Sequence, residues 1–324
     1  MCRIGYNDNV HAGFSIGRIT WNKERTGYNA MKQIKIGTLI SGGDALRIIP
    51  QIIGYGFETF SLTFWQSTGN IVLPDLAKQV RAITDPKDVT ISSLSVFGNP
   101  LTGTGANADT LASWERAIDS AHLFGTDLVT GFTGRIVDRP IDESIPAFTK
   151  VFGELIRRAK DKGVRIAFEN CDMGGNWERG DWNIAQNPTA WEMMFNAVPE
   201  DNIGLQWEPC HQMVSLIDPI PQLKKWVKRV FNVHGKDCTI DWDVIRKFGI
   251  HGSQQFAWHR TPGFGDTDWV RVISILREAG YEGSIDIEGW HDPVYRGELE
   301  YTGQVHGLNY LKQCRGGTFV PNPE

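Results

Sequence analysis

Three glutamates and one histidine end four successive β-strand patterns in the second half of the chain. The patterns RIAFE, GLQWE, FNVH and SIDIE end at Glu169, Glu208, His234 and Glu288. Each pattern is a short apolar or alternating run, which is typical of a buried strand. Three carboxylates and one imidazole form a ligand set that suits a divalent cation such as Mn²⁺, and it also suits Zn²⁺, Co²⁺, Fe²⁺ or Mg²⁺.

Each of these residues also has an ordinary structural explanation when it is taken alone. A glutamate at a strand end usually caps the strand or faces solvent, and a histidine after a buried strand usually packs in the core. Four such residues at the same end of four consecutive strands are much harder to attribute to coincidence. We therefore expect one metal ion, held jointly by Glu169, Glu208, His234 and Glu288.

The elements that must position these side chains alternate between short strand patterns and longer amphipathic helix patterns. Eight strand-then-helix units predict an α/β fold, a closed (β/α)8 barrel formed as a single domain. A doubly wound sheet is the rival, but residues 41–44 (SGGD) lack the glycine spacing of a phosphate-binding turn. The predicted strands are 35–40, 57–64, 89–96, 127–132, 165–169, 203–207, 229–234 and 283–288.

The barrel pattern does not cover the whole chain. Residues 1–33 show no sustained hydrophobic period and are predicted to be an N-terminal extension. The barrel is predicted to span 34–315, and 316–324 form a C-terminal tail.

Composition excludes several classes of function. The 324 residues carry 38 acidic and 33 basic side chains and a net charge of −5, which argues against a nucleic-acid partner. Five scattered cysteines without a CxxC pair indicate reduced thiols and a cytoplasmic protein. No apolar run is long enough for a membrane span, so we expect no membrane partner.

Five segments occur in order along the chain: AFEN with Glu169, GLQWEPCHQM with Glu208 and His211, VFNVHGKD with His234 and Lys236, HRTPGFGDTDW from His259, and SIDIEGWHDP with Glu288. Together they resemble the xylose isomerase-like TIM-barrel superfamily of sugar phosphate isomerases and epimerases, over about residues 35–314. The superfamily also includes inosose dehydratases and the large subunits of C-glycoside deglycosidases.

The resemblance implies one divalent metal, commonly Mn²⁺, held by the four strand-end residues. It also implies that Glu169 and Glu288 flank the substrate and that His211 and Arg260 contact it. One position departs from the family pattern, because the usual Asp-x-x-His is Glu208-x-x-His211 here. The longer side chain leaves the identity and the position of the ion open.

Such a site can run proton-transfer chemistry next to a carbonyl. A metal bound to the carbonyl of a sugar stabilises the enediolate that forms when the α-proton leaves. Glu169 and Glu288 are the candidates to remove and return protons on opposite faces of the substrate. We therefore expect a divalent-metal-dependent isomerase or epimerase of a sugar or keto-sugar.

Two alternatives stay open beside this expectation. A lyase resembling inosose dehydratase, or the catalytic subunit of a C-glycoside deglycosidase, would expel a leaving group from the same enediolate, with His211 and His259 as candidate acids. A non-catalytic sugar-binding barrel is the second alternative. An endonuclease for abasic DNA is not expected, because it would need several histidines placed to bind a zinc cluster and a basic groove. The eight histidines of this chain mostly lie elsewhere, and its net charge is −5. Either a homo-oligomer or a small partner subunit is compatible with the sequence.

The loops at the expected catalytic end are rich in tryptophan. Indole faces suit the C–H faces of a sugar or an aromatic aglycone, which favours a carbohydrate over a small phosphorylated substrate. The long loop 170–187 is expected to cover the substrate. Arg260 and Lys236 are predicted to bind substrate by charge and hydrogen bonds. The predicted substrate-binding tryptophans are Trp65, Trp177, Trp182, Trp258 and Trp290.

Overall fold

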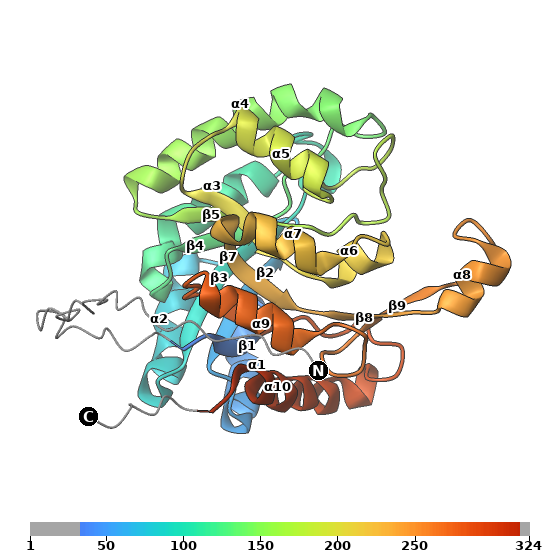
Figure 1. The fold of residues 1–324 in the computed structure, drawn as a ribbon. Helices are drawn as coiled ribbons and strands as arrows, with labels where there is room; N and C mark the ends of the chain where they lie inside the picture. The colour runs from blue at the N-terminus through green and yellow to red at the C-terminus, as the bar shows by residue number, and fades with distance from the viewer. Residues whose placement is uncertain (1–32, 318–324) are drawn as a thin grey trace, which may run out of the picture. The chain divides into compact units, whose positions relative to one another are not determined.

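Eight parallel strands close into a barrel in the computed structural model, which describes residues 33–317 (Figure 1). Neighbouring strands follow the order β1-β10-β7-β6-β5-β4-β3-β2, and β2 closes the ring against β1. The predicted (β/α)8 barrel is therefore confirmed. The barrel strands are β1 (Lys35–Ser41), β2 (Thr59–Trp65), β3 (Thr90–Phe97), β4 (Leu128–Gly131), β5 (Arg165–Glu169), β6 (Ile203–Trp207), β7 (Val230–Gly235) and β10 (Ser284–Ile287).

Helices connect the strands and cover the outside of the barrel (Figure 1). Their buried residues recur at helical spacing, as expected for amphipathic helices that pack on a sheet. The α-helices of the described residues are α1 (Ala45–Ile52), α2 (Leu73–Thr84), α3 (Thr110–Ser120), α4 (Ile141–Asp161), α5 (Pro188–Ala197), α6 (Cys210–Val214), α7 (Pro219–Trp226), α8 (Trp242–Phe248), α9 (Trp269–Glu278) and α10 (Glu300–Arg315).

The predicted strand boundaries agree closely with the structure. Those of β5 and β6 coincide with the prediction, and the others differ by one or two residues. The predicted extension, 1–33, and tail, 316–324, lie almost entirely outside the described residues and stay predictions. Between residues 33 and 317, no helix combines the length and apolar character that crossing a bilayer requires.

An arm after β7 was not predicted from the sequence. It is an antiparallel hairpin of β8 (Asp237–Ile240) and β9 (Ala257–Arg260), with α8 at its tip, and it projects from the barrel (Figure 1). None of the residues of α8 is buried. The strands have four residues each, too few for a clear alternation in the sequence.

The buried Asp237 carboxylate fixes the base of this arm. Its oxygens accept hydrogen bonds from the backbone N–H groups of Cys238, Gly263 and Thr267 and from the indole N–H of Trp269. These contacts join the arm to the loop that leads into α9. The arm is therefore free at its tip and fixed at the end nearest the barrel.

An aromatic cluster supports β5 from outside the barrel. The ring of Phe168 lies edge-on to Phe152 of α4, with centroids 4.7 Å apart, and Trp114 of α3 packs edge-on against Phe152 at 5.4 Å. All three side chains are buried. Such pairs add about 1 kcal/mol each beyond the burial of their area. They hold β5, the strand whose last residue is Glu169.

Inside the barrel, a layer of polar side chains lies one step below the predicted metal ligands. Residues two apart on a strand share a face, so Gln206, Asn232 and Asp286 lie on the same strand faces as Glu208, His234 and Glu288. Gln206 donates to Asn232 (2.9 Å), and Asn232 donates to Asp286 (2.8 Å).

An ion pair joins α10 to the residues that precede β1 and β2, at the amino-terminal end of the barrel. Arg315, in the last turn of α10, donates to the carboxylate of Glu58 at 2.5 and 3.1 Å and to the carbonyl of Ile34 at 2.7 Å. Glu58 also accepts the N–H of Ile36. Burial on its own would raise the pKa of Glu58, but Arg315 and the Ile36 N–H lower it below its ordinary 4.5.

We expect Glu58→Gln to lower the free energy of unfolding by about 2 kcal/mol near pH 7, because Arg315 loses its charged partner. A carboxyl group whose pKa is lowered by folding contributes stability above the pKa of the unfolded chain and loses it as the pH falls. The difference between the variant and the natural sequence should therefore narrow below pH 4.5. Urea unfolding at several pH values measures the free energy of unfolding of both proteins. A difference between them that does not change with pH would contradict this account.

Candidate metal centre

The four strand-end residues predicted to bind metal converge at the carboxyl end of the barrel. Glu169, Glu208, His234 and Glu288 each offer a donor atom, and these atoms all lie within 4.8 Å of one another. Their strands, β5, β6, β7 and β10, are consecutive neighbours in the barrel. All four residues are buried. The geometry is therefore the one expected from the sequence.

The imidazole of His234 lies between two carboxylates. Its Nδ1 is 3.3 Å from Oε1 of Glu169 and 3.1 Å from Oε2 of Glu288. Burial on its own would lower the pKa of His234, but the hydrogen bonds and charges of Glu169 and Glu288 raise it to about 9. The two carboxylates thus create a place that favours positive charge.

The carboxylate of Glu208 is buried without a hydrogen bond to either oxygen. Oε1 lies 3.0 Å from Nε2 of His211, but this approach lacks hydrogen-bond geometry. The backbone around it is fixed, because the Asn170 side chain accepts the N–H of Glu208 (2.7 Å) and donates to its carbonyl (3.0 Å). The sequence analysis did not identify this positioning role of Asn170, whose only sequence signal is that it follows Glu169.

These observations fit a divalent cation. A buried carboxylate without partners costs several kcal/mol unless a positive charge compensates it. Both carboxylate oxygens of Glu208 are buried and have no hydrogen-bond partner. Nε2 of His234 is also buried without a partner. Oxygen donors with one nitrogen suit Mn²⁺ and its neighbours among the divalent ions.

Lys236 is a second source of positive charge at the site. Its buried Nζ donates to Oε1 of Glu288 at 2.7 Å and lies 3.2 Å from Nε2 of His211. Burial on its own would lower the pKa of Lys236, but Glu288 raises it overall. In turn Lys236, His234 and His291 hold the pKa of Glu288 well below its ordinary value, against the effect of burial.

His211 and His259 lie together beside Lys236. Their ring centroids are 4.9 Å apart. Burial lowers the pKa of both rings and the charge of Lys236 lowers it further, well below the ordinary value for His211 and to about 4 for His259. Both imidazoles are therefore neutral at neutral pH, which makes them hydrogen-bonding groups in the resting protein rather than reservoirs of a proton.

His291 was not among the predicted site residues. Its Nε2 lies 3.1 Å from Oε1 of Glu288, three residues earlier in the chain. The ring is half exposed and lies 5.7 Å from that of His259, centroid to centroid. Its only sequence signal is its place in the GWHDP segment after the last strand. Nothing in that segment distinguishes His291 from a histidine with a structural role in a loop.

Arg260 is fixed at the end of β9. Its Nε donates at 3.0 Å to Oδ2 of the buried Asp292, which also accepts the N–H of Thr261. Its guanidinium carbon lies 5.9 Å from the ring centre of Phe264. Asp292 therefore joins the arm to the loop after β10, a positioning role that the sequence analysis missed.

The predicted substrate-binding tryptophans separate into two groups. Trp65 and Trp182 form a pair with centroids 5.3 Å apart, and Trp65 is 58% exposed. Trp182 packs on a small cluster of Phe97, Phe132 and Cys171, and the Phe97 ring lies 6.3 Å from that of His234. This pair thus connects to the metal centre through an apolar wall.

The other three tryptophans have different environments. Trp290 is about half exposed and stacks on His291. Trp177 is partly buried and packs against the main hydrophobic core, and its contact with substrate stays a prediction. Trp258 lies on β9 opposite Thr239, half-buried.

The long loop after β5 is anchored at several points. The buried guanidinium of Arg135 donates to the carbonyls of Asn176 and Trp177, and Asn183 donates to the carbonyls of Glu169 and Cys171. The loop is thereby tied directly to the strand end that carries Glu169. Its expected role in covering the substrate stays a prediction.

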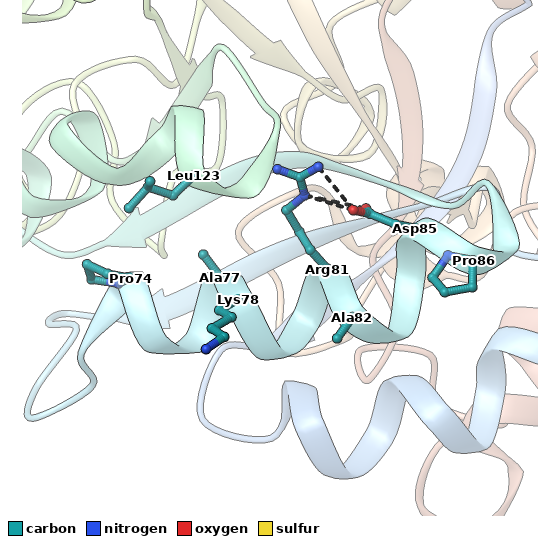
Figure 2. A pocket seen from close by; sticks show the side chains of 8 residues that line it. All are labelled: Pro74, Ala77, Lys78, Arg81, Ala82, Asp85, Pro86 and Leu123. Atoms are coloured by element: carbon teal, nitrogen blue, oxygen red, sulfur yellow. Dashed lines mark hydrogen bonds and ion pairs between the residues drawn. The ribbon is translucent and has the colours of Figure 1, made fainter.

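An open groove of about 410 Å³ lies elsewhere, along α2 (Figure 2). It contains an ion pair of Arg81 with Asp85, and Leu123 lies across from the helix. None of the predicted site residues lines this groove. It offers no cluster of chemically reactive side chains.

A family model described as "Xylose isomerase-like TIM barrel" matches residues 51–314. The chain belongs to this family. The resemblance seen in the five sequence segments is thereby confirmed. Family membership supports the barrel, while the role of each site residue rests on the geometry above.

Inosose dehydratase from Clostridium tetani is 28% identical to the chain over 188 residues, which cover 55% of this chain and 59% of that enzyme. The chain therefore spans less than two thirds of this relative. Among solved structures, a xylose isomerase domain protein from Planctomyces limnophilus superposes with a TM-score of 0.68 at 17% identity, over 87% of this chain and 98% of that one. The 3-keto-D-glucoside 4-epimerase YcjR from E. coli gives 0.65 at 14%, over 87% and 100%. At these identities the two structures show a shared fold.

We expect Glu208→Gln to have opposite effects with and without metal. In the presence of a chelator the variant should melt at a higher temperature, because it removes a buried charge that has no hydrogen bonds. The natural sequence should gain about 2.7 kcal/mol at Mn²⁺ concentrations of about 100 times Kd, and the variant far less. Thermal unfolding with EDTA and with Mn²⁺ measures both effects. A variant as responsive to Mn²⁺ as the natural sequence would exclude Glu208 as a ligand.

Proposed function

We propose that the protein is a divalent-metal-dependent isomerase or epimerase of a sugar or keto-sugar. The observation that carries this proposal is the pairing of Glu169 and Glu288. Both carboxylates are buried, both approach Nδ1 of His234, and they arrive from strands on opposite sides of β6 and β7. Two bases that flank one centre are what proton removal and return require.

Glu169, Glu208, His234 and Glu288 would hold the metal, with Mn²⁺ the preferred ion of this donor set. When bound, the ion supplies Lewis-acid stabilisation of the negative charge that develops on the substrate as its α-proton leaves. Its positive charge would lie beside the carboxylates of Glu169 and Glu288, which both approach Nδ1 of His234.

The remaining residues act by orientation and charge. Glu169 and Glu288 would each transfer one proton: the glutamate that is ionised would accept the α-proton, and the one that is protonated would return a proton on the other face. Lys236 donates to Glu288 and favours its ionised form. His211 and His259, both neutral, would donate hydrogen bonds to substrate hydroxyl groups. Arg260 is held by Asp292 and Lys236 by Glu288, so both cations keep a fixed position toward the substrate.

A lyase reaction on a keto-sugar is the second candidate. Inosose dehydratase is among the relatives of the chain, and expulsion of a β-substituent begins with the same removal of an α-proton. In that case His211 or His259 would lie next to the leaving group. A protein of this kind, with four free cysteines among its described residues, fits a reducing compartment such as the cytoplasm.

Solvent isotope exchange tests the proposal. The Mn²⁺-loaded protein, incubated in D2O with a panel of sugars and keto-sugars, should place deuterium at the carbon next to the carbonyl. Retention of the remaining mass indicates an isomerase or epimerase, and loss of water or of an aglycone indicates a lyase. Absence of exchange across the panel would refute both reactions.

We expect Glu169→Gln and Glu288→Gln each to reduce this exchange by about 10²–10⁴-fold, because each removes one proton-transfer group. Glu178→Gln, at an exposed position in the loop after β5, is the matched control and should exchange at the natural rate. If both site variants kept full exchange, a non-catalytic role for the two glutamates would follow.

We expect Trp65→Ala to raise KM by about fivefold with little change in kcat, because an exposed indole packed against Trp182 contributes about 1 kcal/mol of ring contact to a bound sugar. Trp242→Ala is the control, since that indole is also half exposed but lies on α8 at the tip of the arm. Steady-state kinetics with a substrate found by isotope exchange provides the measurement. Equal effects of the two variants would remove Trp65 from the substrate site.

A further inference from the structure

A second group of metal-binding side chains lies beside the first. Glu169, Cys171 and His211 each offer a donor atom, and these atoms all lie within 4.8 Å of one another. All three residues are buried. The group shares only Glu169 with the metal centre described above.

The imidazole of His211 has a nitrogen available for a ligand. Its Nε2 faces Oε1 of Glu208 at 3.0 Å and Nζ of Lys236 at 3.2 Å. Its Nδ1 is buried and has no hydrogen-bond partner; the nearest carboxylate oxygen, Oδ1 of Asp172, is 3.8 Å away. A buried ring nitrogen without a partner carries a cost that a cation would remove.

The thiol of Cys171 is held in place by its backbone. Its carbonyl accepts a hydrogen bond from Asn183 at 2.8 Å, and its Sγ accepts the N–H of Met173 at 3.4 Å. The same Asn183 side chain also binds the carbonyl of Glu169. One amide therefore fixes the spacing between the thiol and the carboxylate.

Sulfur, nitrogen and oxygen donors differ from the oxygen-rich set of the first centre. A thiolate with an imidazole selects thiophilic ions such as Zn²⁺ over Mn²⁺ or Mg²⁺. Ligand distances near 2.0–2.3 Å around zinc place donor atoms about 3–4 Å apart. The donor atoms, which lie within 4.8 Å of one another, must therefore approach by about 2 Å at most to reach this spacing.

We propose that Glu169, Cys171 and His211 form a second cation site, which takes a thiophilic divalent ion such as Zn²⁺. The site adjoins the first centre through the shared carboxylate of Glu169. An ion there engages the carboxylate oxygens of Glu169, which would transfer a substrate proton. Zn²⁺ therefore lowers the rate at which the Mn²⁺-loaded protein exchanges substrate protons for solvent deuterium. This last consequence rests on the proposed function, whereas the binding of the ion does not.

Co²⁺ is the probe that distinguishes the two sites, because only the second supplies sulfur. Titrating the metal-free, full-length protein with Co²⁺ should give two bound equivalents and a thiolate-to-cobalt charge-transfer absorption in the near ultraviolet. Cys171→Ser should lose this absorption and one equivalent, while the visible d–d bands of the first centre remain. Cys314→Ser, a half-buried cysteine outside the group, is the matched control and should keep both.

His211→Asn is a second variant, and should also lose the charge-transfer band; circular dichroism checks that each variant is folded. A natural protein without the band, or a band that survives in folded Cys171→Ser, overturns the proposal. If instead the band persists while Glu208→Gln leaves the visible bands unchanged, the second site stands and the metal dependence of the proposed function fails.

Discussion

The arrangement of the site depends on how the mutual repulsion of three buried carboxylates is compensated. Glu169, Glu208 and Glu288 lie within a few ångströms of one another with almost no access to water. Two unit charges 4 Å apart repel by about 4 kcal/mol at an effective dielectric constant of 20. Such a cluster persists only if positive charge is placed among its members, and His234 and Lys236 provide part of that charge. The barrel supplies the rest of the constraint by fixing the ends of four adjacent strands.

Much of this arrangement could be predicted from the sequence because barrels impose a strict relation between sequence and place. A residue at the carboxyl end of a strand lies at the mouth of the barrel, whichever strand carries it. Four strand patterns that end in Glu169, Glu208, His234 and Glu288 were therefore enough to predict a shared site. In β5 and β6 the apolar run gives way directly to polar residues, so the bounds of these two strands could be predicted from the sequence.

The parts that the sequence did not indicate depend on contacts between loops. Asn170 acts through the backbone of Glu208, and Asp292 acts through the Thr261 N–H and the Arg260 side chain; neither set of contacts leaves a residue pattern in the sequence. His291 and Cys171 lie in the loops just after β10 and β5, where no strand alternation in the sequence indicates the direction of a side chain. The roles expected for Trp177 and Trp182 could not be separated either, since both lie in one loop and only packing distinguishes them.

The arm formed by β8, α8 and β9 has a consequence for which substitutions this chain can tolerate. Its tip contributes nothing to the core of the barrel, whereas its two ends enter the site through Lys236 and Arg260. Substitutions at the exposed positions of α8 should therefore change the surface of the protein with little effect on its folding. The contacts of Asp237 at the base of the arm isolate the candidate metal ligands from such changes at the tip.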